Sequence, residues 1–268
     1  MDNSNLVSET VIPCRSPLAG WVGGKHKLAS SILKKIPAHT CYVEPFCGAA
    51  WVLLKKPESK VEVLNDINNE IITLFRCIQY HLDEFVRYFR WALVSRDEFE
   101  RLKAVNADTL TDIQRAARFY YLHQACFGGK IVSPSFGVNV TRSSRLNLLR
   151  IEETLSAVHL RLSRVTMECL PYREVITRYD NPKTFFYIDP PYWNCERDYG
   201  PGIFAKDDFA NLAEQLATIK GNFILSLNDT PDIRRIFSGF GMEPIQTKYT
   251  LGNTNDKTGT ELLIYPKK

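Results

Sequence analysis

An alternation of short apolar strands and amphipathic helices restricts the fold of this chain more than any other feature. Its first part has helical patterns at residues 28–36, from the turn at 48 through 54 and at 70–79, and strand patterns at 41–45 and 61–66. Pro37 ends the first helix, because proline disfavours the helical conformation in the residue before it. Strand, helix, strand and helix in sequence favour a parallel sheet with right-handed crossovers.

A helical interruption then separates this first part from the rest of the pattern. Amphipathic helical stretches occur at residues 83–103, 111–124 and 150–162, and residues 127–147, rich in Gly, Ser, Asn and β-branched types, suit a loop or hairpin. We therefore expect residues 71–162 to form an insertion. Residues 1–70 and 163–268 would then form one α/β domain around it.

The alternation resumes after the interruption. Strand patterns occur at residues 165–169, 184–188, 222–227 and 261–265, and helical patterns at 207–219 and 232–237. The sheet is thus expected to be split in sequence by roughly 85 residues. A length of 268 residues suits one large domain that carries a modest insertion.

Composition excludes several classes of protein. With 44% hydrophobic and 24% charged residues, the chain can bury a substantial core without metal or disulfide support. Its seven cysteines form no CxxC pair and no histidines stand at metal-ligand spacing, which indicates reduced thiols in a cytoplasmic protein with no metal site. No signal peptide and no run of 18 apolar residues occurs, so secretion and membrane spanning are disfavoured.

The basic residues are unevenly distributed. A net charge of +4 does not by itself indicate nucleic-acid binding, but residues 130–164 contain six basic residues against two acids. The basic residues are Lys130, Arg142, Arg145, Arg150, Arg161 and Arg164. This segment fits either a surface that follows a phosphate backbone or an ordinary solvated loop and helix face.

A candidate nucleotide-binding turn follows the first expected strand. The run from Glu44 to Gly48 places a glycine where backbone can approach a ligand, next to the free N–H groups of a helix N-terminus. Asp66 ends the next strand 18 residues later, close to the spacing of about 20 at which an acid meets ribose hydroxyls. On their own, these features also fit a turn glycine and a helix-capping aspartate.

A second candidate site is Asp189-Pro190-Pro191-Tyr192, which follows the apolar strand at 184–188. Open α/β sheets place their sites at the carboxyl ends of strands. Two prolines stiffen the loop, so a carboxylate, a proline carbonyl and an aromatic face are held in fixed relation. A planar heteroaromatic amine needs this set, two acceptors and a stacking partner. The alternative is a turn with an aspartate cap.

The motifs and their order resemble the DNA adenine methyltransferase (Dam) family of bacteria and phages, from about residue 16 to residue 266. The matching runs are Trp21-Val22-Gly23-Gly24-Lys25, Val43-Glu44-Pro45-Phe46-Cys47-Gly48-Ala49, Asn65-Asp66-Ile67-Asn68, Asp189-Pro190-Pro191-Tyr192 and Glu261-Leu262-Leu263-Ile264-Tyr265. The resemblance implies an α/β fold, a Rossmann-like, mostly parallel methyltransferase sheet with a helical and hairpin target-recognition insertion before the Asp-Pro-Pro-Tyr loop.

The resemblance also implies S-adenosylmethionine as cofactor, double-stranded DNA as substrate and roles for individual residues. Catalysis would fall to Asp189, Pro190 and Tyr192. The cofactor would be bound by Trp21, Lys25, Phe46, Gly48, Asp66 and Asp189, with Phe46 and Gly48 beside its methionine part and Asp66 at its ribose. DNA would be bound by Lys130, Arg142 and Arg145.

Three departures from the family pattern affect these expectations. Ala50 stands where many members have a second turn glycine, which alanine can replace only if its backbone keeps a negative φ. Gly20 stands where close relatives of GATC-reading enzymes often carry a lysine, and residues 127–139 lack their arginine-rich character. The recognition sequence, GATC or a related one, therefore stays open.

The function that we expect is site-specific methylation of the exocyclic amino group of adenine, with the base flipped out of the duplex. Such an enzyme would be a cytoplasmic monomer, of the kind that occurs in restriction-modification systems. Two alternatives remain open. One is the same chemistry on another amine, in RNA adenine, cytosine or a protein glutamine; the other is a DNA-binding relative that has lost catalysis.

Overall fold

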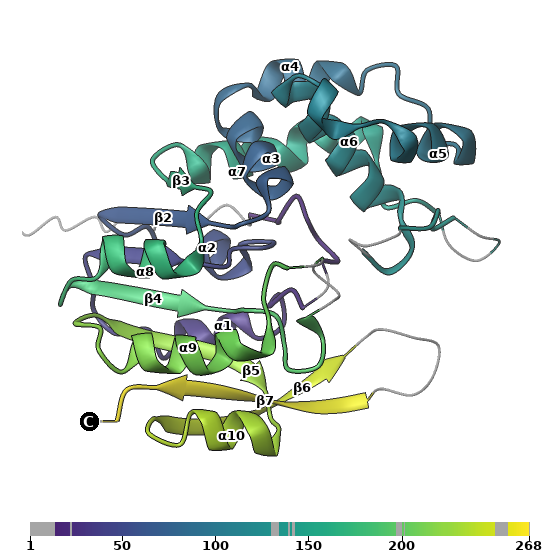
Figure 1. The fold of residues 1–268 in the computed structure, drawn as a ribbon. Helices are drawn as coiled ribbons and strands as arrows, with labels where there is room; N and C mark the ends of the chain where they lie inside the picture. The colour runs from purple at the N-terminus through teal and green to yellow at the C-terminus, as the bar shows by residue number, and fades with distance from the viewer. Residues whose placement is uncertain are drawn as a thin grey trace, which may run out of the picture.

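The computed structural model describes residues 14–21, 23–129, 134–138, 140, 143–196, 200, 202–249 and 257–267. Within them, seven strands form one sheet in the order β3-β2-β1-β4-β5-β7-β6 (Figure 1). The strands are β1 (Cys41–Glu44), β2 (Val61–Asn65), β3 (Thr166–Glu168), β4 (Thr184–Ile188), β5 (Asn222–Asn228), β6 (Gly241–Tyr249) and β7 (Lys257–Tyr265). The first five in spatial order are parallel and β7 is antiparallel to both its neighbours, which confirms the α/β, mostly parallel fold.

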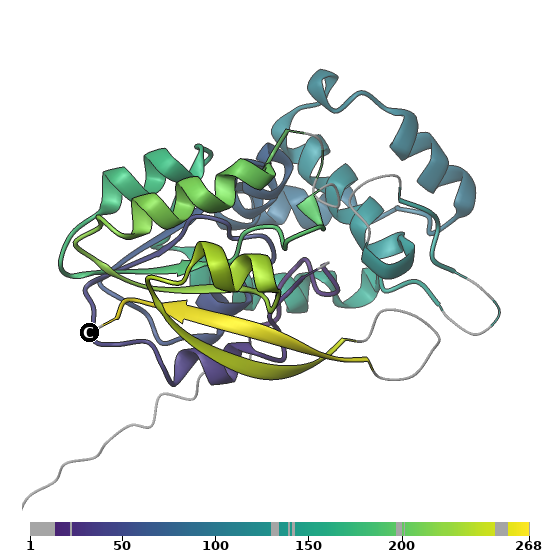
Figure 2. The ribbon, with the colours of Figure 1, turned by 60° about the horizontal axis from the view of Figure 1, so that its bottom comes forward.

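The helices lie in two layers and a helical extension. They are α1 (Ala29–Leu33), α2 (Trp51–Lys55), α3 (Asn69–Tyr80), α4 (Leu82–Tyr88), α5 (Arg96–Ala104), α6 (Asp112–Ala125), α7 (Ile151–Leu162), α8 (Tyr172–Tyr179), α9 (Lys206–Leu216) and α10 (Pro231–Ile236), with short 3-10 turns at Ala107–Thr109, Phe127–Gly129 and Leu148–Arg150. Figure 2 shows the sheet between α8 and α9 on one side and α1 on the other.

Alternation along the strands divides the core between the two faces. Val43 and Phe186 pack in a cluster with α8, α9 and α10, whereas their chain neighbours Tyr42 and Phe185 pack with α1, α2 and α3. Because successive side chains of a strand point to opposite faces, the strands at the centre of the sheet must be apolar throughout. β4 is accordingly buried at all five positions.

The helical extension shares its core with the sheet. α3 packs on α6 and α7, and α4 and α5 lie farther out (Figure 1). Phe75 of α3, Phe85 of α4 and Leu155 of α7 belong to the same hydrophobic cluster as Phe185 of β4. The extension is therefore a packed continuation of one helix layer.

Three parts of the fold differ from the sequence prediction. The helical stretch at 83–103 is two helices, since Ser95 caps a new helix by accepting a hydrogen bond from the Glu98 N–H. β6 and α8 were not predicted. Pro244 disfavours a strand, but β6 lies at the sheet edge, where a missing N–H is tolerated.

Ala50 does not have the negative φ that the sequence analysis required of an alanine at this position. Its φ is +51° and its ψ is +33°, so an alanine occupies the left-handed region immediately before α2. This conformation costs a residue with a Cβ roughly 1–2 kcal/mol relative to glycine. Its N–H donates to the Cys47 carbonyl at 2.6 Å, and the residue is buried, so the surrounding turn holds it in place.

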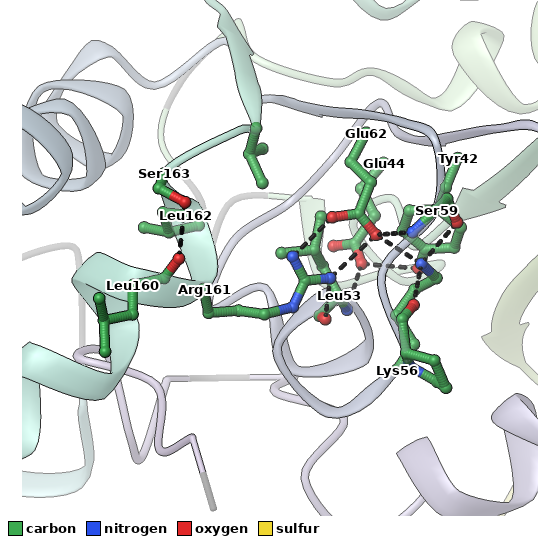
Figure 3. Close-up of polar contacts among 12 residues, drawn as sticks. Tyr42, Glu44, Leu53, Lys56, Ser59, Glu62, Leu160, Arg161, Leu162 and Ser163 are labelled. Atoms are coloured by element: carbon green, nitrogen blue, oxygen red, sulfur yellow. Dashed lines mark hydrogen bonds and ion pairs between the residues drawn. The ribbon is translucent and has the colours of Figure 1, made fainter. Parts of the chain in front are cut away.

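A buried ion network ties the extension to the sheet (Figure 3). Arg161 of α7 donates to both carboxylate oxygens of Glu62 at 2.5 and 2.9 Å and to the Leu53 carbonyl at 2.9 Å. Lys56 contacts the same carboxylate at 2.5 Å. Arg161 is therefore not part of a phosphate-facing surface, and Arg150 instead pairs with Glu153 on the exterior. The basic segment of the sequence is not one continuous surface.

Candidate functional site

A cavity that opens to solvent lies at the carboxyl ends of the parallel strands. Its walls come from the ends of β1, β2 and β4 and from the loop before α1. The structure brings six predicted residues to it: Trp21, Lys25, Phe46, Gly48, Asp66 and Asp189. Parallel strands meet at one edge, which explains how residues far apart in sequence reach one cavity.

Asp66 connects the turns that follow β1 and β2. Its Oδ2 accepts the Gly48 N–H at 3.0 Å and its Oδ1 accepts the Asn68 N–H at 2.9 Å. Burial raises the pKa of Asp66 to about 6, although the two backbone hydrogen bonds oppose that rise. The carboxylate is therefore fixed at the cavity wall and is mainly ionised at neutral pH.

Trp21 forms a second wall and is firmly packed. It is buried, and its ring lies 5.5 Å from the His123 ring and 6.2 Å from the Phe119 ring, both on α6. A Cβ on Gly48 would lie 3.1 Å from Trp21 Nε1, and Gly48 has a φ of +44°. Glycine thus allows the β1–α2 turn to approach the tryptophan closely.

Lys25 is a buried cation at the centre of the site. Its Nζ lies 2.7 Å from Asp189 Oδ1, 2.9 Å from the Gly23 carbonyl oxygen and 4.7 Å from the centroid of the Tyr192 ring. The side chain is 4% exposed. Taken alone, its motif also fits a surface lysine on a Gly-Gly turn, but here it joins the loop before α1 to the Asp-Pro-Pro-Tyr loop.

Opposing influences set the protonation of Asp189. Burial raises its pKa, the charge and hydrogen bond of Lys25 lower it, and the charge of Glu261 raises it, which together give a pKa of about 6. The carboxyl group is therefore mainly ionised at neutral pH and becomes protonated under mildly acidic conditions. It can accept hydrogen bonds from an amine above about pH 6.

The Asp-Pro-Pro-Tyr loop is held from its far end by Asn228, at the end of β5. The Trp193 N–H donates to Asn228 Oδ1 at 2.9 Å, and Asn228 Nδ2 donates to the Trp193 carbonyl at 3.1 Å. The Trp193 ring also packs 5.0 Å from that of Phe209. Pro190 is buried, so this loop has a fixed shape.

Sequence reasoning missed four residues of this region. Trp51 and Tyr187 line the cavity, Asn228 holds the loop, and Glu261 lies behind Lys25. Asn228 is the polar last residue of β5, and Glu261 directly precedes an apolar run within β7; these positions were the signals that could have identified them. Trp51 and Tyr187 resemble ordinary core residues in sequence.

The structure describes one of the three predicted DNA-binding residues, Arg145. Lys130 and Arg142 lie outside the described residues. Arg145 donates to the Ala19 carbonyl at 3.2 Å and to the His123 carbonyl at 2.7 Å. A Cβ at Gly20, where φ is +93°, would lie 1.8 Å from Arg145 Nη1, so glycine makes room for this guanidinium. A contact between Arg145 and DNA stays a prediction.

In the described part of the chain, no three His, Cys, Asp or Glu side chains are grouped so as to hold a metal ion. All seven cysteines are free thiols, and burial raises the pKa of Cys47 well above its usual value. No helix in the same residues is long and apolar enough to span a membrane.

Comparison with known proteins identifies relatives along nearly the whole chain. The family model for D12 class N6 adenine-specific DNA methyltransferases matches residues 21–251. The chain is 23% identical to the Type II methyltransferase M.CviBI of Paramecium bursaria Chlorella virus NC1A, over 92% of this chain and 95% of that protein. It is 29% identical to the DNA adenine methylase of Serratia marcescens, over 80% and 84%. It is 26% identical to the Retron Ec67 DNA adenine methylase of Escherichia coli, over 92% and 90%.

Proposed function

The chain belongs to the D12 class N6 adenine-specific DNA methyltransferase family, and we propose that it transfers a methyl group from S-adenosylmethionine to the amino group of a flipped adenine in duplex DNA. The main support is that the Asp189 carboxylate and the Tyr192 ring both contact Lys25 Nζ, next to the cavity that Asp66 and Asp189 line. A hydrogen-bond acceptor for an amine and a candidate ribose acceptor thus lie at one edge of the sheet.

The residues around the cavity fit S-adenosylmethionine. Asp66, fixed by two backbone N–H groups, would accept the ribose hydroxyls, and Trp21 would form an apolar wall. Phe46 and Gly48 would lie beside the methionine part, where Phe46 is supported by the Tyr172 ring at 5.3 Å. When bound, the cofactor supplies an electrophilic methyl group on a positively charged sulfur. Asp66 and Asp189 bring negative charge to the cavity, which favours a cationic ligand.

The Asp-Pro-Pro-Tyr loop would prepare the amine. Asp189 and the Pro190 carbonyl would accept the two N–H bonds of the amino group, and Tyr192 would stack on the adenine ring. Lys25 holds Asp189 Oδ1, which leaves Oδ2 for the amine. These hydrogen bonds favour a pyramidal nitrogen that attacks in line. The N–C bond forms as the S–C bond breaks, and the nitrogen then loses a proton, which ionised Asp189 can accept.

The helical segment at 71–162 would select the target. We propose that it is a target-recognition insertion and that Lys130, Arg142 and Arg145 contact DNA phosphates. The target would be GATC or a related sequence, and the enzyme would act as a cytoplasmic monomer. Neutralising Arg142 should weaken DNA binding and lower the slope of log affinity against log salt by about one. An unchanged slope would exclude Arg142 from the phosphate contacts.

Substitution of Asp189 tests the proposal directly. The purified wild-type protein should transfer labelled methyl groups to duplex DNA, and mass spectrometry of the nucleosides should show N6-methyladenine. Asp189→Ala should reduce the rate by roughly a thousandfold or more, since both an acceptor and a charge are lost. Asp232→Ala, which removes an exposed partner of Arg235, should retain activity and is the matched control.

The methylated nucleosides found in this assay also distinguish the proposed function from its alternatives. Methylated cytosine, methylated RNA or an active Asp189→Ala variant would contradict the assignment. Failure of the wild-type protein to bind S-adenosylmethionine in a calorimeter would indicate a DNA-binding relative without catalysis. Modification-sensitive sequencing of DNA from expressing cells would give the recognition sequence.

A further inference from the structure

Glu261 is a buried carboxylate on β7, a strand that runs in the opposite direction to the parallel strands of the site. β7 runs antiparallel to β5, and Glu261 pairs in register with Asn228 at the carboxyl end of β5. Glu261 is the middle residue of β7, and its pairing with Asn228 places it level with the edge where the parallel strands end. The Ser226 hydroxyl donates to Glu261 Oε2 at 3.0 Å, and the glutamate is 3% exposed.

Glu261 shares one ammonium group with Asp189. Lys25 Nζ lies 2.7 Å from Asp189 Oδ1 and 4.0 Å from Glu261 Oε2. All three side chains are buried or nearly so, with exposures of 4%, 18% and 4% for Lys25, Asp189 and Glu261. In such surroundings charges interact much more strongly than in water, so one cation cannot satisfy both carboxylates fully.

We propose that Glu261 is a positioning residue of the methyl-transfer site, which competes for the Lys25 ammonium and so keeps the Asp189 carboxylate available to the substrate amine. The inference rests on the proposed function, because it gives Asp189 the role of amine acceptor. If the Glu261 charge is removed, Lys25 pairs with Asp189 alone. The carboxylate then becomes a weaker acceptor, although it stays in place.

The surroundings of Asp189 support this assignment. Among the described residues, the titratable groups near the Lys25–Asp189 pair are Glu44 on β1, Tyr187 on β4, Tyr192 on the loop and Glu261 on β7. Burial raises the pKa of Glu44 to about 8, so this group is largely neutral at pH 7. Burial holds the pKa of Tyr187 well above its usual value, so it too is neutral. Glu261 is thus the acid whose charge opposes Lys25 at Asp189.

The decisive variant is Glu261→Gln, which keeps the shape of the side chain and removes its charge. Asp189 can be titrated in the full chain by carbon NMR of labelled aspartate carboxyl groups, with an Asp189→Asn spectrum to identify its signal. We expect the midpoint to fall from near 6 by about one unit. In the pH profile of single-turnover methyl transfer, the midpoint of the acid limb should fall by the same amount. The plateau rate at higher pH should also decrease.

Ser226→Ala is the matched control, because it removes the hydrogen bond to Glu261 but retains the charge. Its Asp189 midpoint should stay within about 0.3 units of the wild-type value. If Glu261→Gln does not fold, Glu261→Asp retracts the charge by one methylene group, and a smaller shift in the same direction is expected. An unchanged midpoint in the folded glutamine or aspartate variant, or equal shifts in Glu261→Gln and Ser226→Ala, would overturn the inference.

The two readouts separate this inference from the proposed function. The NMR titration needs no methyl transfer, so it remains informative if the wild-type protein fails to methylate adenine. That failure would refute the proposed function alone. Methylation by the wild-type protein together with an unmoved Asp189 titration in the Glu261 variant would refute only the positioning role.

Discussion

Removal of Arg161 should show how strongly the helical extension is fastened to the sheet. Arg161→Met keeps most of the aliphatic volume but removes the two hydrogen bonds to Glu62 and the bond to the Leu53 carbonyl. The Arg161 and Glu62 side chains are 11% and 5% exposed. Glu62 would remain buried, with Lys56 as its remaining cationic partner among the described residues, since that ammonium lies 2.5 Å away.

The expected loss follows from this geometry. Breaking a buried ion pair costs about 3–5 kcal/mol, because the remaining charge cannot return to water. Lys56 and the Ser59 N–H still stabilise the carboxylate, so the lower end, about 3 kcal/mol, is expected. A typical domain has roughly 5–15 kcal/mol of stability in total. The variant should therefore fold but unfold at a clearly lower urea concentration.

The loss should also depend on pH. Burial raises the pKa of Glu62, but its hydrogen bonds to Arg161 and Lys56 outweigh that effect, and the net pKa is lowered. A lowered carboxyl pKa contributes stability above the unfolded value of about 4.3 and loses it as pH falls through the folded value. The stability difference between wild-type protein and Arg161→Met should thus be full at pH 7 and shrink as the pH falls through the lowered folded pKa of Glu62.

Urea unfolding followed by circular dichroism measures this difference. Arg150→Met is the control, because Arg150 forms an exposed pair with Glu153 and should lose less than about 0.5 kcal/mol. A loss below about 1 kcal/mol for Arg161→Met, or equal losses for both variants, would falsify the view that the buried network fastens α7 to the sheet.

Other substitutions test the site itself. Lys25→Met should raise the pKa of Asp189 above about 6, because the ammonium lowers it, and a pH–rate profile should show the acid limb at higher pH. Asp66→Asn should weaken S-adenosylmethionine binding about tenfold or more in calorimetry, since a charged acceptor is lost; unchanged affinity would remove Asp66 from the ribose site. Gly20→Ala should cost roughly 2 kcal/mol in thermal unfolding, through its φ of +93° and the displaced Arg145, and an unchanged melting temperature would contradict this.

The central sheet could be predicted because its strands are short apolar runs bounded by clear turn residues. Phe185 and Ile188 on β4 illustrate this, and the Asp-Pro-Pro-Tyr loop follows directly. Asp66 and Gly48 could be paired from their spacing, as the hydrogen bond between them shows. In each case, the signal lies within a few residues or within one βαβ unit.

The remaining features depend on contacts between distant segments, which a single sequence does not display. Lys25 precedes α1 and Asp189 follows β4, so the two side chains meet only in the folded chain. Arg161 belongs to a basic run in sequence, yet its partner Glu62 lies on β2 and removes it from the surface. Ala50 adopts a left-handed conformation because the packed turn outweighs the preference of an alanine.

The order of strands has a consequence for how the chain could be divided. β1 and β2 precede the helical extension, and their outer neighbours β4 and β3 follow it. A chain cut between α6 and α7 would give one piece whose two strands lack partners on both sides and a second piece with the matching edges. Neither piece would hold Lys25 and Asp189 together. Co-expression of the two pieces should reassemble the sheet, and DNA methylation would then report whether two fused partner proteins have met.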